Sequence, residues 1–183
     1  MASASPRRLA LLAQIGLVPD AVLSPAIDET PRPREVPRAL ALRLARAKAA
    51  AVTDPGFVLA ADTVVAVGRR ILPKPEDEGA ARACLTLLSG RRHRVLTAVV
   101  VRAPDGRRAE RLAESAVTFA RLSGRQIAAY LASGEWRGKA GGYAIQGLAA
   151  AHIRALGGSY SGVVGLPLFE TAQLLRGLGY PLP

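Results

Sequence analysis

Two adjacent arginines stand at the start of the first predicted helix, where helix electrostatics disfavours them. In the run Ser3-Ala4-Ser5-Pro6-Arg7-Arg8, Ser5 is placed to be the N-cap and Pro6 the first helical residue. The first turn of a helix carries partial positive charge and favours acidic side chains. A bound anion would remove the conflict, because helix N-termini and guanidinium groups both bind phosphate. The alternative is a solvated basic turn.

Asp62 is a carboxylate inside an otherwise apolar run from Phe57 to Val67. A buried charge is costly unless it is paired, bound to a metal or placed at a cleft. The position predicts a general base or a metal ligand, and the alternative is an aspartate that caps a neighbouring loop. Glu29, in a proline-rich loop beside Asp28, is by itself a solvated loop acid. Together with Asp62 it would supply hard oxygen ligands for Mg²⁺ or Mn²⁺.

Three lysines and one glutamine are placed to contact a nucleotide. Lys48 borders the apolar face of its helix, Lys74 is fixed between two prolines, and Lys139 lies among glycines whose backbone N–H groups can approach an anion. Each lysine has the alternative of a solvated side chain. The amide of Gln146 can donate and accept, which matches the O4 and N3–H edge of a pyrimidine, or it lies on a surface strand.

The elements that must position these residues alternate between helix and strand. Helices are predicted over 6–15, 37–52, from 76 to before Gly90, over 123–133 with a Ser123–Gln126 capping box, and over 167–177. Strands are predicted over 57–67 and 95–102, then after an Asp105-Gly106 turn to about residue 119 or 122, with short strands near 22–23 and on both sides of Gly157-Gly158. This order indicates one α/β domain over residues 1–183 with a mixed sheet.

Composition limits the classes of partner. Half of the residues are hydrophobic but only 4% are aromatic, and the net charge is +11, which favours acidic partners such as nucleotides. Scarce aromatic side chains argue against nucleic-acid binding. The single cysteine, Cys84, excludes an intrachain disulfide, and neither histidine has a visible catalytic partner, so we assign them to structure. Without an apolar leader or a membrane span, we expect a cytoplasmic protein.

A set of short motifs occurs in order along nearly the whole chain. They are Ser3-x-Ser5-Pro6-Arg7-Arg8, Asp28-Glu29-Thr30, Lys48-Ala49, Ala61-Asp62-Thr63-Val64, Lys74-Pro75, Leu88-Ser89-Gly90, Lys139-Ala140-Gly141-Gly142-Tyr143-Ala144-Ile145-Gln146-Gly147, and Gly158-Ser159-Tyr160 with Val163-Val164-Gly165-Leu166-Pro167. Single motifs are weak, but the ordered set resembles the Maf-family nucleoside triphosphate pyrophosphatases. The Asp62-Thr63 step and the Tyr143–Gly147 segment resemble the subgroup that acts on dTTP and UTP.

The resemblance implies a fold, a reaction and a set of roles. The fold would be similar to that of inosine triphosphate pyrophosphatases, with a long mixed sheet and two lobes around a nucleotide cleft. The reaction would be metal-dependent hydrolysis of nucleoside triphosphates, including non-canonical ones, to the monophosphate and pyrophosphate, with Mg²⁺, Mn²⁺ or Co²⁺ as cofactor. The implied catalytic roles are general base (Asp62), metal ligand (Asp62 and Glu29, with Glu29 alternatively orienting water), and catalysis with phosphate binding (Lys48). The other implied substrate contacts are to the phosphates (Arg8, Lys74, Lys139), to the base (Arg7, Thr63, Gln146) and to an unspecified part of the substrate (Ser5). A homodimer is a family expectation.

Two departures from the family pattern and two competing functions stay open. Only Met1 and Ala2 precede Ser3, where the family has its first strand, so that strand would be very short or begin upstream. Ser161-Gly162 stands where members often have a larger polar residue, which would loosen the closing loop. The competing functions are a non-catalytic nucleotide-binding regulator of cell division and, from the charge alone, a nucleic-acid binder.

Overall fold

The chain builds a long antiparallel sheet of five strands, seen in a computed structural model that describes residues 1–182. The strand order across the sheet is β2-β1-β3-β4-β5. The strands span β1 Val58–Val67, β2 Arg70–Leu72, β3 Arg92–Arg102, β4 Arg108–Phe119 and β5 Ile153–Gly157. The predicted α/β class and long central strands are confirmed.

The sheet differs from the predicted one in the direction of its strands. A mixed sheet was expected, but all four pairings between the described strands are antiparallel. The reason lies in the connections. β2 folds back on β1 as a short hairpin, and the chain then returns through a helix to lay β3 antiparallel to β1. β3 and β4 form a second hairpin around Asp105-Gly106, where Gly106 has φ +85°.

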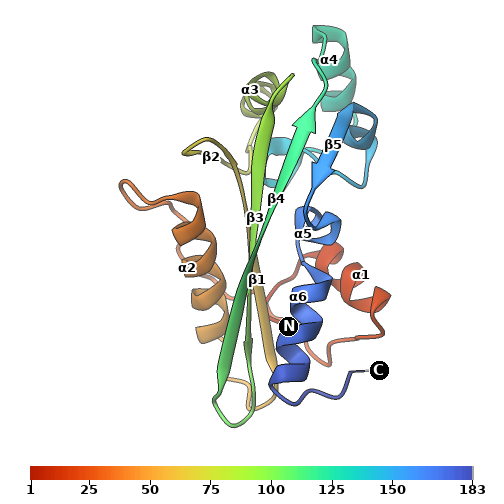
Figure 1. Ribbon diagram of the computed structural model, residues 1–183. Helices are drawn as coiled ribbons and strands as arrows, with labels where there is room; N and C mark the ends of the chain where they lie inside the picture. The colour runs from red at the N-terminus through yellow and green to blue at the C-terminus, as the bar shows by residue number, and fades with distance from the viewer. Residues whose placement is uncertain (183) are drawn as a thin grey trace.

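Helices lie on both sides of this sheet (Figure 1). They are α1 Pro6–Gln14, α2 Pro37–Ala50, α3 Glu78–Leu88, α4 Gly124–Ala132, α5 Tyr160–Val164 and α6 Leu168–Gly177, with 3-10 turns η1 Ala140–Gly142 and η2 Leu148–His152. In Figure 1, α2 stands alone on one side, α1, α5 and α6 gather on the other, and α3 and α4 lie at the far end of the sheet. Among the described helices, none has both the length and the apolar character needed to cross a membrane.

One face of the sheet forms a single apolar core with α2. Side chains alternate between the faces of a strand, so Val58, Ala60, Val64 and Ala66 of β1 all meet the apolar side of α2. That side includes Leu40 and Leu44, and the α2 turn that follows brings Lys48 against the sheet. Asp62 belongs to the same face of β1 and faces α2 as well.

The other face is divided. One cluster, around Val65, Val95 and Val117, packs with α3 and α4, and a second, around Leu59 and Val99, packs with α1 and α6. Polar side chains stand between the two clusters, from Thr63 on β1, Thr97 on β3 and Ser115 on β4. We call these three residues the polar belt. α5 and the N-terminal segment cover it.

Several local predictions are confirmed and others are wrong. Ser123 and Gln126 form the expected capping box at α4. No strand forms near Val22-Leu23, although Leu23 donates its N–H to the Met1 carbonyl at 2.9 Å.

The second short strand expected after Gly158 is instead helix α5. The Ser159 side chain accepts a hydrogen bond from the Gly162 N–H and begins the helix.

The predicted helix ends are off by a few residues. α2 ends at Ala50, two residues before the predicted end at residue 52. α3 begins at Glu78 because the Asp77 side chain caps it.

Candidate active site

The site opens at a gap along the outer edge of β1. On one side of the gap, Ala2 donates its backbone N–H to the Leu59 carbonyl at 2.8 Å. On the other side, β2 begins to pair with β1 at Val65. Within the described chain, no strand pairs with this edge of β1 between those points. Asp62 and Thr63 lie in the gap and point to opposite faces of the sheet, so a ligand at the edge can reach both.

A pocket of about 240 Å³ lies at this gap. Nine of the ten predicted site residues line it: Ser5, Arg7, Arg8, Lys48, Asp62, Thr63, Lys74, Lys139 and Gln146. The tenth, Glu29, is joined to the pocket through ion pairs with Lys48 and Lys74. The structure thus brings together residues from α1, α2, β1, the segment before α3 and the glycine-rich segment before η2. Their catalytic and binding roles remain predictions.

Asp62 and Lys48 form a buried ion pair. The Lys48 Nζ lies 2.6 Å from Asp62 Oδ1, and the two residues are only 8% and 4% exposed. Lys48 was expected at the border of its helix face, but it is buried among the apolar residues of α2 because Asp62 neutralises it. Removing one partner of such a pair leaves an uncompensated buried charge, which costs about 3–5 kcal/mol.

Glu29 extends this pair into a chain of alternating charges. Its two carboxylate oxygens lie 2.6 Å from Lys48 Nζ and 2.7 Å from Lys74 Nζ. Burial raises the pKa of Glu29, but the hydrogen bonds from both lysines outweigh burial and lower the pKa to about 2. Arg43 of α2 holds the loop that carries Glu29, because it donates to the Thr30 carbonyl at 2.9 Å.

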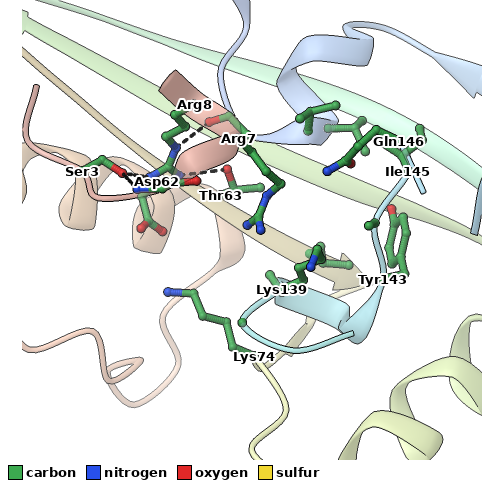
Figure 2. A pocket seen from close by; sticks show the side chains of 18 of the residues that line it. Ser3, Arg7, Arg8, Asp62, Thr63, Lys74, Lys139, Tyr143, Ile145 and Gln146 are labelled. Carbon is green, nitrogen blue, oxygen red and sulfur yellow. Dashed lines mark hydrogen bonds between the residues drawn. The ribbon is translucent and has the colours of Figure 1, made fainter. Parts of the chain in front are cut away.

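Arg8 is buried and holds three parts of the pocket together. Its guanidinium donates to the Gly165 carbonyl at 2.8 Å, to the Ser3 hydroxyl at 2.9 Å and to the Thr63 hydroxyl at 3.3 Å (Figure 2). These bonds tie the loop after α5, the N-terminal segment and β1. Burial lowers the pKa of Arg8, opposed by the Asp62 charge. Two of the five guanidinium donors are left for a ligand, so a phosphate contact would come in addition to this positioning.

Among the cations that line the pocket, Arg7 and Lys139 have the fewest contacts with protein acceptors. Among the described residues, no protein partner is assigned to the Arg7 guanidinium, and Lys139 has one long contact, to the Arg137 carbonyl at 3.3 Å. Burial lowers the pKa of Lys139, and the nearby Arg7 adds to the effect. Figure 2 shows Arg7, Lys74 and Lys139 around one opening. The conflict at the first helix is therefore real, since no acidic side chain occupies its first turn.

The Thr63 hydroxyl is joined to the polar belt. Thr97 Oγ1 lies 2.7 Å from the Gly162 carbonyl and 3.0 Å from Thr63 Oγ1. Because a hydroxyl has one proton, Thr97 donates to the carbonyl and accepts from Thr63. The Thr63 oxygen is then left only as an acceptor toward a ligand. Sequence reasoning assigned no site role to Thr97, Ser3 or Tyr143. The contacts of Thr97 and Tyr143 come from residues 34 to 65 positions away along the chain.

The segment after Lys139 forms the wall opposite Asp62. Gly141 and Gly142 have φ near +70°, and a Cβ on Gly141 would lie 2.9 Å from Val65 Cγ1. This close approach brings the segment against β1. Tyr143 is buried beside the pocket and Gln146 is exposed. Figure 2 shows these two residues on the side of the pocket away from Ser3 and Asp62.

A comparison with family models gives a decisive match. A model described as "Maf-like protein" matches residues 1–178. The chain belongs to the Maf family. The match covers every residue of the pocket, so the Maf-family resemblance inferred from the ordered motifs is confirmed.

Similar curated proteins carry one name. A dTTP/UTP pyrophosphatase of Gluconobacter oxydans is 69% identical over 185 residues, covering 97% of this chain and 85% of the relative. Another, from Granulibacter bethesdensis, is 66% identical, covering 98% of this chain and 92% of the relative. A solved structure from Mycobacterium abscessus, titled nucleoside-triphosphatase / dITP/XTP pyrophosphatase, has 20% identity and a TM-score of 0.38 over 66% of this chain and 71% of its own.

The carboxylates of this Maf-family pocket suit a divalent metal. Among the described residues, there is no group of three or more potential His, Cys, Asp or Glu ligands. Mg²⁺, however, is commonly held by one or two carboxylates, with substrate phosphates and water completing the set. Glu29 and Asp62 provide two such carboxylates, both in contact with Lys48. The donor set fits a metal that is bound together with a triphosphate.

Proposed function

We propose that this chain is a nucleoside triphosphate pyrophosphatase that hydrolyses dTTP and UTP. Water attacks the α-phosphorus, the bond to the bridging oxygen breaks, and the products are the monophosphate and pyrophosphate. The observation that carries the proposal is Asp62, a carboxylate only 4% exposed that lines a cation-rich pocket in the unpaired edge of β1. The name shared by relatives at 66–69% identity supports the same activity.

Asp62 is the proposed general base. Its carboxylate is fixed by Lys48 through one oxygen, so the group has a defined orientation in the pocket. General bases act within hydrogen-bond distance of the proton that they remove, and a fixed side chain holds that distance. Arg7, Arg8, Lys48, Lys74 and Lys139 exceed the two carboxylates in number by three, so the pocket favours a polyanion. Positioning and charge are what phosphoryl transfer chiefly needs.

A divalent metal is part of the proposal, with Glu29 and Asp62 as its protein ligands. When bound, it would lower the pKa of the attacking water and neutralise phosphate charge. Glu29 is ionised at all ordinary pH values, since its pKa is about 2. Chelation by EDTA is expected to abolish hydrolysis, with Mg²⁺, Mn²⁺ or Co²⁺ restoring it. Full hydrolysis in EDTA would contradict this part of the proposal.

Base selection is assigned chiefly to Gln146, on the wall of the pocket opposite Asp62 (Figure 2). The Gln146 amide has both a donor and an acceptor and is exposed next to the pocket. That pair matches the O4 and N3–H groups shared by thymine and uracil. Arg7 and Thr63 are the other residues proposed to contribute. Replacement by glutamate (Gln146→Glu) removes the donor and should lower the preference for UTP over CTP.

Pyrophosphate release from a panel of dTTP, UTP, CTP and GTP tests the function. We expect dTTP and UTP to be preferred, and Asp62→Asn to lower kcat by roughly 10²–10⁴-fold, the usual contribution of a general base. Glu110→Gln is the matched control, because Glu110 pairs with the exposed Arg46 outside the pocket. The proposal fails if no nucleotide releases pyrophosphate. Nucleotide binding without turnover would then favour the regulatory alternative.

A further inference from the structure

The segment Tyr143–Leu148, which carries Gln146, is held from behind by three side chains that do not line the pocket. They are His93 of β3, Tyr130 of α4 and Glu135 in the turn after α4. The proposed chemistry uses none of them. Each makes one hydrogen bond to the segment, and together these bonds surround the position of Gln146 in the sequence.

The first contact joins His93 to Tyr143. The His93 Nε2 lies 2.7 Å from the Tyr143 hydroxyl, and the two rings meet edge to face. His93 is 2% exposed, and its Nδ1 is buried with no hydrogen-bond partner within the described part of the chain. An apolar pair of similar shape would avoid this unpaired atom at little or no cost in stability. The polar pair is therefore better explained by where it places Tyr143 than by what it adds to folding.

The second contact fixes the backbone of the next residue. The Ala144 N–H donates to the Tyr130 hydroxyl at 3.0 Å. Tyr130 is 4% exposed and lies in the core beside α3. A buried backbone N–H without a partner is costly, so this bond ties the segment to α4. Burial raises the pKa of Tyr130 to about 12, and the hydroxyl stays protonated.

The third contact lies on the other side of Gln146. The Leu148 N–H donates to the Glu135 carboxylate at 2.9 Å. That carboxylate occupies the space where a side chain of residue 147 would begin, because a Cβ on Gly147 would lie 2.2 Å from Glu135 Oε2. The φ of Gly147 is −112°, which any residue can adopt. A glycine is thus needed here to admit the carboxylate and not to relieve the backbone.

We propose that His93, Tyr130 and Glu135 are positioning residues for base recognition, since they fix both ends of the short segment that presents Gln146. The proposal rests on the proposed function, in which Gln146 contacts the pyrimidine. Two contacts precede Gln146 and one follows it, so the backbone of Gln146 has little freedom to move. Discrimination between bases depends on such placement, because a misplaced hydrogen-bonding group no longer penalises the wrong base.

Variants of Glu135 test the proposal. Their activities on UTP and CTP are compared, because the two nucleotides have bases of similar size. Glu135→Ala should raise the KM for UTP and lower the UTP-to-CTP ratio of kcat/KM by about tenfold, the size expected for one lost hydrogen bond. The kcat for UTP should change little. Glu135→Gln should restore the ratio, because the amide oxygen still accepts from the Leu148 N–H. Gly147→Ala should act like Glu135→Ala, since its Cβ displaces the carboxylate.

Tyr130→Phe tests the second contact in the same way, and Glu114→Ala is the matched control. Glu114 is a surface carboxylate that pairs with Arg94 away from the pocket. An unchanged UTP-to-CTP ratio in Glu135→Ala and Tyr130→Phe overturns the proposal. An equal loss of kcat/KM for UTP and CTP, together with a lower melting temperature, also overturns the proposal, because that result indicates a purely structural role.

The wild-type measurement separates this proposal from the function on which it rests. If the wild type does not hydrolyse UTP, the proposed function fails. In that case, the ratio of the UTP and CTP affinities, measured by calorimetry for the wild type and for Glu135→Ala, replaces the ratio of kcat/KM as the test. A ratio of affinities that the substitution leaves unchanged overturns the positioning role as well.

Discussion

Lys48 has an unusual place among the residues of the site because it contacts both proposed metal-binding carboxylates. Its Nζ lies 2.6 Å from a carboxylate oxygen of Asp62 and 2.6 Å from one of Glu29. A lysine between two carboxylates keeps them close despite their like charge. The same ammonium is placed to neutralise a phosphate when a metal binds the carboxylates. Under the proposed function, Lys48 would thus act both in the free site and in the site with its ligands.

The pH dependence of stability should report on Glu29. Its pKa falls from 4.5 to about 2, because the lysine hydrogen bonds outweigh burial, which acts in the opposite direction. A group with a lowered folded pKa stabilises the protein above its unfolded pKa, and this contribution is lost as the pH falls. Relative to Glu29→Gln, the wild type should lose about 1 kcal/mol between pH 4.5 and 2, since the 40% exposure of the side chain weakens the ion pairs.

Denaturant unfolding of both proteins at a series of pH values measures this loss. The difference between wild type and Glu29→Gln should be constant above the unfolded pKa of the carboxyl and shrink below it. Curves that stay parallel through the acidic range would show that the lysines do not hold Glu29 in solution. Asp28, the exposed neighbour of Glu29, makes Asp28→Asn a control for the loop itself.

At the scale of elements, the glycine-rich segment before η2 depends on its approach to β1. Gly138 and Gly141 both have positive φ, +65° and +70°. A Cβ on Gly138 would meet no atom within 4 Å, whereas a Cβ on Gly141 would lie 2.9 Å from Val65 Cγ1. Gly138→Ala should cost about 1–2 kcal/mol for the left-handed backbone alone. Gly141→Ala should cost more and also raise the KM for UTP, because the wall that carries Lys139 must move.

The comparison of these two alanine variants isolates the contact with Val65. Thermal unfolding gives the stabilities, and pyrophosphate release gives the KM. Equal stabilities in the two variants would mean that the segment adjusts without disturbing β1. If the clash with Val65 causes the loss of stability, the double variant Gly141→Ala/Val65→Ala should lose less stability than the sum of the two single variants.

The sequence predicts those elements whose signals are local. The apolar run of β1, the capping box at Ser123 and the proline at the start of α1 each lie within a few residues of what they determine. α5 was mistaken for a strand because a helix of five residues gives little periodic signal, and the bonds that hold it against the sheet come from distant residues. The Gly162 carbonyl accepts from Thr97, and the Gly165 carbonyl accepts from Arg8.

The site was predictable as a set of residues but not as an arrangement. Asp62 was visible as a charge within an apolar strand, and nine other residues were chosen by type, by motif or by family resemblance. The burial of Lys48, the ion pair of Glu29 with Lys74 and the bond from Arg8 to Gly165 depend on contacts spanning 14, 45 and 157 residues. No local pattern encodes separations of this kind.

At the scale of the whole molecule, net charge should govern how substrate arrives. The chain carries +11, and its pocket has more cations than carboxylates. Such a field draws in polyanions and weakens with ionic strength, since the Debye length shortens to about 8 Å at physiological salt. The KM for UTP should therefore rise several-fold from low salt to about 0.3 M, with little change in kcat.

Two charge-removing variants make this test specific to the pocket. Lys139→Gln should flatten the salt dependence of the KM, because Lys139 lines the pocket. Arg108→Gln removes the same charge from the start of β4, outside the pocket lining, and should leave the slope close to that of the wild type. Equal slopes for the two variants would show that total charge alone sets the salt dependence of the KM.

The homodimer and the cytoplasmic location stay predictions.

The gap in the edge of β1 has a consequence for isotope labelling. Leu59 directs its carbonyl toward Ala2, so alternate residues Ala61 and Thr63 direct their backbone groups into the same gap, while Ala60 and Asp62 bond to β3. In deuterated buffer, the amides of Ala61 and Thr63 should exchange early and those of Ala60 and Asp62 late. One of the most buried strands would thus show protection at every second residue. A nucleotide that fills the gap should slow the two fast amides, marking its own binding site.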